Sequence, residues 1–253
     1  MASRATKGMK VKKILISQPE PESKNSPYYN LAEKHKLKLK FKPFIHIEGV
    51  TSREFRRQKI NLLDYSAVIF TSRSAIDHFF RLCEEMRVNM PQATKYFCMT
   101  ESIALYLQKY ILYRKRKVFH ANGTTTSIKE LIKKHKEEKF MFPCSDVHKK
   151  TIPDYIGELG AEYVEAVIYR TVYSDLSDLQ VSDFDMIVFF SPRGIESFQD
   201  SFPEFEQGET KMAAFGPTTT KSVATHWRLD VKAPEPQTPS MAMAIDNYLK
   251  AAK

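Results

Sequence analysis

The residues of this chain best suited to chemistry are hydroxyl-rich turns that follow short apolar runs. These turns stand at 71–72, 100–102, 191–194 and 216–220. In an open parallel α/β sheet, such turns lie at the carboxyl ends of the strands, where backbone N–H groups and helix dipoles bind anions. Ser and Thr also cap helices when no ligand is present, so capping stays open as the role of each single hydroxyl. Taken as a set, the turns favour a cleft that binds several carboxylates or phosphates.

The elements that carry these turns are repeated along the chain. DYSAVIFTSRSAIDHFF, which contains Ser72, has a near-copy in DFDMIVFFSPRGIESFQ, which contains Ser191. The following elements echo each other in the same order, with Ser102 opposite Thr218. Echoes that keep their order along a chain indicate an internal duplication.

Each copy alternates short apolar strands with amphipathic helices. The expected strands are continuous apolar runs, at 14–16, 68–70, 96–98, 140–142, 187–190 and 213–215. Runs of this kind followed by helices are typical of parallel sheets that are covered on both faces. Helix starts are expected at hydroxyl-bearing capping residues, at 71–72, 126–127 and 238–240. The sequence therefore predicts an α/β fold with two similar flavodoxin-like parallel-sheet domains.

Two segments do not fit inside such a sheet. Residues 37–48 alternate Lys with apolar residues, which predicts one strand with a wet face. Residues 163–174, at the equivalent place in the second copy, are also long and extended. The two segments are expected to pair as a two-stranded β-ribbon linker between the domains. Whether each copy folds on itself or the chain crosses over there stays open at this point.

Composition and charge narrow the class of protein. The chain is 42% hydrophobic, and no apolar run reaches the roughly 18 residues that a membrane span needs. The three cysteines, Cys83, Cys98 and Cys144, have no CxxC spacing, which predicts a reduced, cytoplasmic protein. Residues 1–145 carry 29 Lys+Arg against 13 Asp+Glu. This basic half indicates either an anionic partner or solvated surfaces.

Motifs for other kinds of chemistry are missing from the sequence. No GxGxxG follows a strand, and neither GxxxxGK[ST] nor GxSxG occurs, which disfavours dinucleotide, P-loop and serine-hydrolase functions. The seven histidines show no ligand-like spacing with Cys or carboxylates, so no metal is expected. Any reaction is expected to depend on positioning and hydrogen bonding, without a cofactor.

In the order and spacing of its motifs, the chain resembles the uroporphyrinogen-III synthase family. The motifs are FTSRSA, IYRT, FFSPRG, AAFGPTTT and a closing PEPQTPSMAMAI. Each motif is weak alone, but together they extend over nearly the whole chain from Val11.

The resemblance implies a chain that crosses between two domains. One domain would comprise 1–40 plus 172–253 and the other 48–163, with linker strands at 41–47 and 164–171. It also implies the substrate hydroxymethylbilane, a linear tetrapyrrole polycarboxylate. In haem biosynthesis this substrate loses water and closes to uroporphyrinogen III, with inversion of ring D through a spiro intermediate. A monomer is expected.

The same resemblance gives roles to individual residues. Tyr169, in the IYRT motif, becomes the candidate proton donor, because a phenol is protonated at neutral pH; packing against the ribbon is the alternative. Substrate binding falls to seven turn residues, Ser72, Ser102, Ser191, Gly194, Gly216, Thr218 and Thr219. Met99 replaces the glycine usual in one turn of this family, which weakens the assignment of Ser102. Arg73 and Arg193 are expected either to bind carboxylates or to stand exposed at helix starts.

Three functions compete on these grounds. A cofactor-free tetrapyrrole cyclase leads. The alternative is a non-catalytic two-domain binder of an anionic small molecule, for which Tyr169→Phe would change nothing chemical. Nucleic-acid binding ranks last, because no basic motif with interleaved aromatic residues occurs. Neither nucleic acid nor a membrane is expected as a partner.

Overall fold

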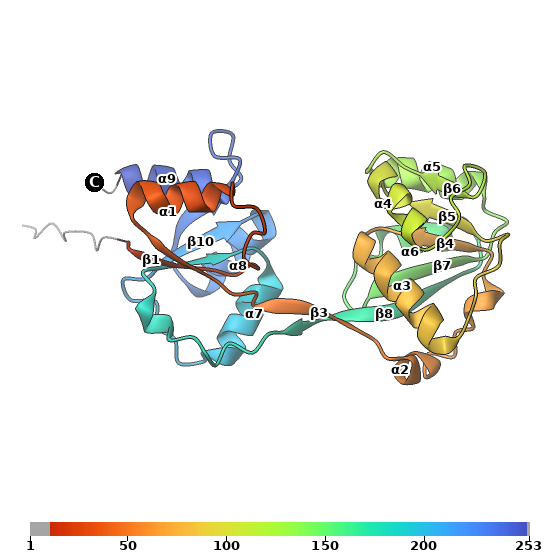
Figure 1. Ribbon diagram of the computed structural model, residues 1–253, viewed down its shortest axis with the longest axis horizontal. Helices are drawn as coiled ribbons and strands as arrows, with labels where there is room; N and C mark the ends of the chain where they lie inside the picture. The colour runs from red at the N-terminus through yellow and green to blue at the C-terminus, as the bar shows by residue number, and fades with distance from the viewer. Residues whose placement is uncertain (1–10, 252–253) are drawn as a thin grey trace, which may run out of the picture. The chain divides into compact units, whose positions relative to one another are not determined.

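The chain folds as two α/β units, each built on a largely parallel sheet (Figure 1). The computed structural model describes residues 11–251. The first unit is built from two segments of the chain, one up to His46 and one from Val172 onward. The second unit comprises Ile47–Thr171. Residues 1–10 and 252–253, which the expected discontinuous domain includes, lie outside the described residues.

The first unit has five parallel strands in the order β11-β10-β9-β1-β2. Counted within the unit, this is the order 2-1-3-4-5 of flavodoxin-like folds. The strands are β1 (Lys13–Ile16), β2 (Lys38–Phe41), β9 (Met186–Phe189), β10 (Lys211–Phe215) and β11 (Leu229–Ala233). Apolar residues of α1 (Pro27–His35) and α9 (Met241–Ala251) pack on one face of the sheet. Those of α7 (Pro192–Ser201) and α8 (Pro217–His226) pack on the other.

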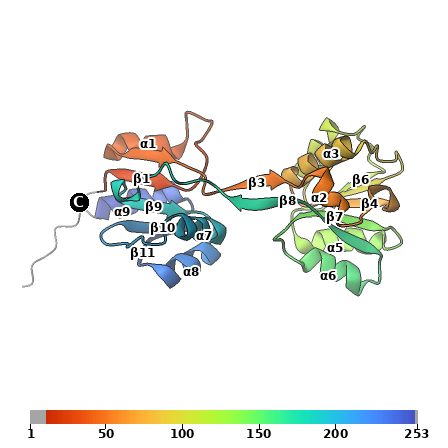
Figure 2. The same ribbon diagram turned by 90° about the horizontal axis from the view of Figure 1, so that it is seen from below.

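The second unit has the strand order β3-β8-β7-β4-β5-β6, in which the five strands β8-β7-β4-β5-β6 correspond in position to β2-β1-β9-β10-β11 and β3 is added at the edge. Its strands are β3 (Ile45–Gly49), β4 (Ala67–Phe70), β5 (Lys95–Cys98), β6 (Val118–His120), β7 (Phe140–Ser145) and β8 (Tyr163–Tyr173). One face carries α2 (Ser52–Arg56), α3 (Arg73–Met86) and α4 (Glu101–Tyr106). The other carries α5 (Thr125–Lys134) and α6 (Thr151–Glu158), as Figure 2 shows. Within residues 11–251, three 3-10 turns complete the elements: η1 (Leu62–Asp64) and η2 (Leu107–Lys109) in this unit and η3 (Val181–Asp183) in the first.

The central strands are buried on both faces, which explains their continuous apolar runs. In β4, Val68 and Phe70 pack beneath α3, while Ala67 and Ile69 pack beneath α5 and α6. All four residues are fully buried. The six strands expected from apolar runs are confirmed, each with bounds that differ little from the expected ones.

The two sheets correspond element by element, but each takes its elements from both copies of the repeat. β1-α1-β2 matches β7-α6-β8, and β4-α3-β5-α4-β6-α5 matches β9-α7-β10-α8-β11-α9. The first unit thus combines the beginning of one copy with the end of the other. The chain crosses over, and neither copy folds on itself.

The strands β3 and β8 form the expected ribbon. Ser174 N donates to Phe44 O at 2.9 Å, and Val50 N donates to Ile168 O at 3.0 Å. Because the residue numbers run in opposite directions along this ladder, the two strands are antiparallel. Over Tyr163–Tyr169, β8 also pairs with β7 and so belongs to the sheet of the second unit.

Two local predictions were wrong. Residues 37–48 are not one strand: they divide into β2 and β3 around Pro43, which has no N–H to donate to a ladder. The next residue, Phe44, is fully buried, and its carbonyl accepts from Ser197 Oγ at 2.5 Å. The cap of α5 is Thr124 instead of residues 126–127, because the Thr124 side chain accepts from Ser127 N and the helix begins one residue later.

Candidate functional site

The hydroxyl-rich turns lie where the sequence predicted, directly after the carboxyl ends of the central strands. In the second unit, Ser72 follows β4 and Thr100 follows β5. In the first unit, Ser191 follows β9 and Gly216 follows β10. Since β4 and β5 are neighbours in one sheet, and β9 and β10 in the other, each unit brings its own two turns to one sheet edge.

Ser72 and Ser191 have the same local geometry. The Ser72 hydroxyl oxygen accepts from Ala75 N at 3.1 Å, and the Ser191 oxygen accepts from Gly194 N at 3.0 Å. Both side chains are therefore helix N-caps, of α3 and α7. Capping uses an oxygen lone pair and leaves the hydroxyl proton available as a donor.

Ser102 is not the cap of its helix. It lies exposed in the first turn of α4, and Thr100 is the cap, with Ile103 N donating to Thr100 Oγ1 at 3.3 Å. The two hydroxyl oxygens of Thr100 and Ser102 are 3.0 Å apart. In the same turn, Gly123 N donates to Met99 O at 2.9 Å.

Gly194 and Gly216, the two glycines assigned to substrate binding, are favoured at their positions for different structural reasons. Gly194 is buried in α7, where an added Cβ would lie 3.3 Å from Ser191 Oγ and 3.8 Å from Phe44 Cβ. Packing of the cap against the core thus favours glycine there. Gly216 has φ +88° and ψ 151°, a conformation almost restricted to glycine.

The turn after Gly216 starts α8 without a capping side chain. No side chain accepts from the first turn of this helix. Thr218 in this turn is exposed, whereas Thr219 is buried, with 2% of its surface accessible. An uncapped helix N-terminus with an exposed first turn is a favourable place for a carboxylate.

Tyr169 lies on β8 and reaches the Ser72 turn, although the sequence separates the two widely. The Tyr169 phenol lies close enough to the Ser72 side chain for that hydroxyl to influence its pKa. Burial raises the pKa of the Tyr169 phenol above its ordinary value, the Ser72 side chain opposes that shift, and Cys144 adds to it. The phenol is therefore protonated throughout the neutral range and is able to donate.

His78 is a site residue that sequence reasoning missed. Its ring stacks on that of Tyr169, with centroids 5.2 Å apart and planes 26° apart. Burial lowers the pKa of His78, and the charge of Arg81 lowers it further, against an opposing effect of Asp77. Its Nδ1 atom is buried without a hydrogen-bond partner in the part of the chain that the structure describes. No periodicity in the sequence marked it, because the step from Ser72 to His78 is about 1.7 helical turns and does not return to the same face of α3.

Arg73 and Arg193 both lie beside tyrosines. The Arg73 guanidinium is exposed and lies 5.4 Å from the centre of the Tyr106 ring. In the first unit, Arg193 lies 5.3 Å from the centre of the Tyr173 ring and pairs with Glu196 at 3.2 Å. Both guanidiniums stand at helix starts, and Arg193 already has a carboxylate partner within its own unit.

One group of metal-ligand types was not foreseen. The ligand atoms of Cys144, His148 and Glu165 all lie within 4.8 Å of one another. Glu165 already accepts from Lys150 at 2.6 Å and contacts His148, whose Nδ1 lies 2.8 Å from Ser145 O. Burial raises the pKa of the Cys144 thiol to about 12. The group is thus an internally neutralised cluster, and the Cys-x3-His spacing was the signal for it.

Within residues 11–251, no helix combines the length and apolarity needed to cross a membrane.

The sheet order, the crossover and the ligand-ready turns define a class: two-unit α/β proteins of flavodoxin-like halves joined by a β-ribbon. The sequence model of the family described as uroporphyrinogen-III synthase HemD matches residues 27–243. The chain therefore belongs to the uroporphyrinogen-III synthase family, as its motifs indicated.

Known relatives agree with this assignment. A uroporphyrinogen-III synthase of Chlorobaculum parvum is 23% identical over 255 residues, covering 95% of this chain and all (100%) of the relative. Among solved structures, uroporphyrinogen-III synthetase of Helicobacter pylori aligns with a TM-score of 0.58 at 15% identity. A mutant uroporphyrinogen III synthase of Thermus thermophilus gives 0.56 at 14%. Each alignment covers 95% of this chain and 99% of the other, so the expected fold class is confirmed.

Proposed function

We propose that this protein is a uroporphyrinogen-III synthase, a hydro-lyase that cyclises hydroxymethylbilane to uroporphyrinogen III. Membership of the family supports the reaction. The observation that carries the chemistry is the Tyr169–Ser72 pair, a protonated phenol at the carboxyl edge of a parallel sheet. The proposed reaction uses no cofactor, because it needs only a proton donor, stabilisation of charge and positioning of the substrate.

In this proposal, the hydroxyl-bearing turns of each unit bind carboxylates of the substrate. The second unit offers Ser72 and Ser102 at the starts of α3 and α4. The first unit offers Ser191 at the start of α7 and Thr218 and Thr219 at the start of α8. Each helix start combines N–H groups with the positive end of a helix dipole. Gly216 adopts a backbone conformation almost restricted to glycine, and Gly194 leaves room for the Ser191 cap.

Tyr169 is the proton donor in the first step. The pyrrole nitrogen pushes electrons toward the hydroxymethyl carbon, the C–O bond breaks, and the oxygen takes the phenol proton and leaves as water. The resulting azafulvene is attacked by the substituted carbon of ring D, which gives the spiro intermediate. The bond from this ring D carbon to the methylene of ring C then breaks, which leaves a second azafulvene on ring C. The other α-carbon of ring D attacks that methylene, so the ring is re-attached in inverted orientation, and the proton lost on aromatisation restores the phenol. Ser72, whose side chain lowers the pKa of the phenol, stabilises the phenolate between these steps by donating a hydrogen bond to it.

The deciding experiment supplies freshly prepared hydroxymethylbilane and separates the products by chromatography. Uroporphyrinogen III as the main isomer is expected. Hydroxymethylbilane closes spontaneously to the type I isomer, so type I as the sole product at every protein concentration would refute the proposal. Tight binding with type I alone would favour the non-catalytic binder of an anionic small molecule.

Three further properties are part of the same proposal. We place the protein in the cytoplasm, because its three cysteines are free and buried, as they are in a reducing compartment. We propose that it is a monomer. We also propose the division into 1–40 plus 172–253 and 48–163, with linker strands between them. Sedimentation at several concentrations tests the monomer, and limited proteolysis tests the division.

A further inference from the structure

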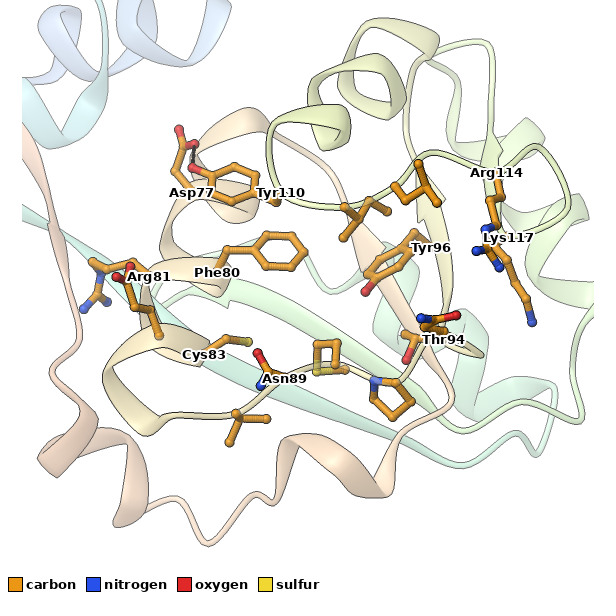
Figure 3. Close-up of a pocket in the computed structure, with 17 residues that line it drawn as sticks. Asp77, Phe80, Arg81, Cys83, Asn89, Thr94, Tyr96, Tyr110, Arg114 and Lys117 are labelled. Carbon is orange, nitrogen blue, oxygen red and sulfur yellow. Dashed lines mark hydrogen bonds between the residues drawn. The ribbon is translucent and has the colours of Figure 1, made fainter.

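A cavity of 590 Å³ lies wholly within the second unit, apart from the turns described above (Figure 3). Its walls are α3, the segment 88–94 that leads into β5, and the segment 110–117 that leads into β6. These segments enter the amino ends of their strands, whereas Ser72 and Thr100 follow carboxyl ends. The cavity is therefore at the opposite edge of the sheet from the proposed catalytic residues. Its volume is in the range typical of small-molecule sites.

One wall of the cavity is flat and aromatic. Phe80 and Tyr110 stack face to face, with ring centroids 4.7 Å apart and planes only 6° apart. Tyr96 lines the cavity beside them, and in Figure 3 its hydroxyl oxygen points toward the interior. Rigid parallel rings of this kind favour a planar apolar body as the occupant.

The other side of the cavity holds a buried hydroxyl without a partner, together with two basic side chains. Thr94 is 3% exposed, and its hydroxyl oxygen has no hydrogen-bond partner within residues 11–251. Buried hydroxyls are normally hydrogen-bonded, so this one indicates a missing partner. In Figure 3, Thr94 lies on the same side as Arg114 and Lys117. Consistent with that view, Lys117 Nζ donates to Ala93 O at 2.9 Å.

The charged groups of the lining differ in whether they have a partner: Arg81, on the far side in Figure 3, already pairs with Glu85. Arg114 is half-buried and makes no ion pair with any described residue. Asp77, which lies on the far side in Figure 3, accepts from the Tyr106 hydroxyl at 2.9 Å and from Tyr110. Glu84 also lines the cavity but is exposed to solvent. The side with Thr94 thus offers positive charge and hydroxyl donors to a negative group.

We propose that this cavity binds a small molecule with a flat aromatic or heteroaromatic body and a carboxylate. The ring packs against Phe80 and Tyr110. The carboxylate accepts hydrogen bonds from Arg114 and Thr94, with Lys117 nearby. The site is separate from the residues proposed for cyclisation, and a ligand there contacts residues of the second unit.

The probe for the test is 2-naphthoate, with its uncharged analogue 2-naphthamide as the matched ligand. Titration calorimetry on the full chain is expected to show one saturable site for 2-naphthoate. Arg114→Gln is expected to weaken 2-naphthoate roughly tenfold and leave 2-naphthamide nearly unchanged, because a charge-assisted hydrogen bond is lost. The control is Lys115→Gln, which removes the same charge from an exposed neighbour and is expected to leave both affinities unchanged.

A second variant separates binding from folding. Thr94→Val is expected to weaken 2-naphthoate about threefold to tenfold without lowering the melting temperature of the free protein, because the hydroxyl has no partner to lose. The absence of saturable binding overturns the proposal. So does binding that neither Arg114→Gln nor Thr94→Val weakens, or that Lys115→Gln weakens equally. Because Arg114 lies outside the proposed catalytic residues, Arg114→Gln is expected to keep the wild-type rate of uroporphyrinogen III formation, and the binding measurement itself does not depend on the outcome of the cyclase test.

Discussion

The imidazole of His78 and the phenol of Tyr169 are stacked, with ring centroids 5.2 Å apart. One ring comes from α3 and the other from β8, so a helix and a strand far apart in the chain fix the phenol orientation together. Because burial and Arg81 lower the pKa of His78, the imidazole is neutral at physiological pH and places no positive charge beside the phenol. A neutral neighbour leaves the phenol proton in place until the substrate takes it.

The hydroxyl of Tyr169 is expected to matter far more for rate than for stability. Tyr169→Phe keeps the stacked ring and removes only the proton donor, so the rate of uroporphyrinogen III formation should fall about 100-fold or more. The free energy of unfolding should change little. Tyr173→Phe is the control, because it removes a hydroxyl from the same strand that bonds to Glu196 instead. Equal rates for the two variants would remove Tyr169 from the proton-donor role.

The two serine caps allow a matched comparison of capping with catalysis. Ser72→Ala and Ser191→Ala each remove one N-cap, and each should lower the free energy of unfolding by about 1 kcal/mol. Of the two serines, Ser72 is the one whose side chain lowers the pKa of the Tyr169 phenol. A double-mutant cycle on catalytic rate should therefore couple Ser72→Ala with Tyr169→Phe and show no coupling for Ser191→Ala. Additive effects in both cycles would mean that the proximity of Ser72 to Tyr169 has no catalytic role.

The backbone at Gly216 should not tolerate a side chain. At φ +88° and ψ 151°, alanine is strained even though no atom lies within 4 Å of the new Cβ. Gly216→Ala should lower the free energy of unfolding by about 1–3 kcal/mol. Gly208→Ala is the control, since φ +48° belongs to the left-handed helical region and the position is also open; its cost should be smaller. Urea unfolding measures both, and equal costs would contradict the argument from conformation.

Alkaline pH should destabilise the protein through its buried thiols. Burial raises the pKa of Cys83, Cys98 and Cys144 from 9.0 to about 12 in the folded chain. Between those values the folded state holds more protons than the unfolded state, so the contribution of these thiols to stability is constant below pH 9 and falls as pH rises above it. Each thiol adds a slope of about 1.4 kcal/mol per pH unit in that window.

Urea unfolding under reducing conditions, from pH 7 to 11, checks this expectation. Cys98→Ala should lose stability less steeply than the wild type above pH 9, while the two curves stay parallel below pH 8. Curves that remain parallel up to pH 11 would show that the folded thiol ionises as freely as the unfolded one.

The fold was predictable because its signals are local. A strand buried on both faces must be apolar throughout, and β4 and β9 show this within four residues each. The repeat then revealed two similar domains, since Ser72 and Ser191 occupy equivalent turns. The division of residues 37–48 was missed because the alternation of Lys with apolar residues continues up to Pro43, where the ladder ends for lack of an N–H group.

The sites were less predictable because they depend on contacts between distant segments. The proximity of His78 to Tyr169 requires the packing of α3 against β8, which no periodicity reveals. Cys144 and His148 are close in sequence, but Glu165 joins them only through the pairing of β7 with β8. The cavity beside Thr94 is formed by two connecting segments, whose paths follow neither strand nor helix patterns.

The exchange of elements between the two sheets has a consequence for ancestry. A chain of half this length, ending after α5, would carry the strands β1 and β2 for one sheet and β4 to β6 for the other. Alone, it would leave both sheets incomplete, and two such chains would complete each other by strand exchange. The present molecule thus has the arrangement that joining two such half-chains end to end would give, with the strand exchange made within one chain.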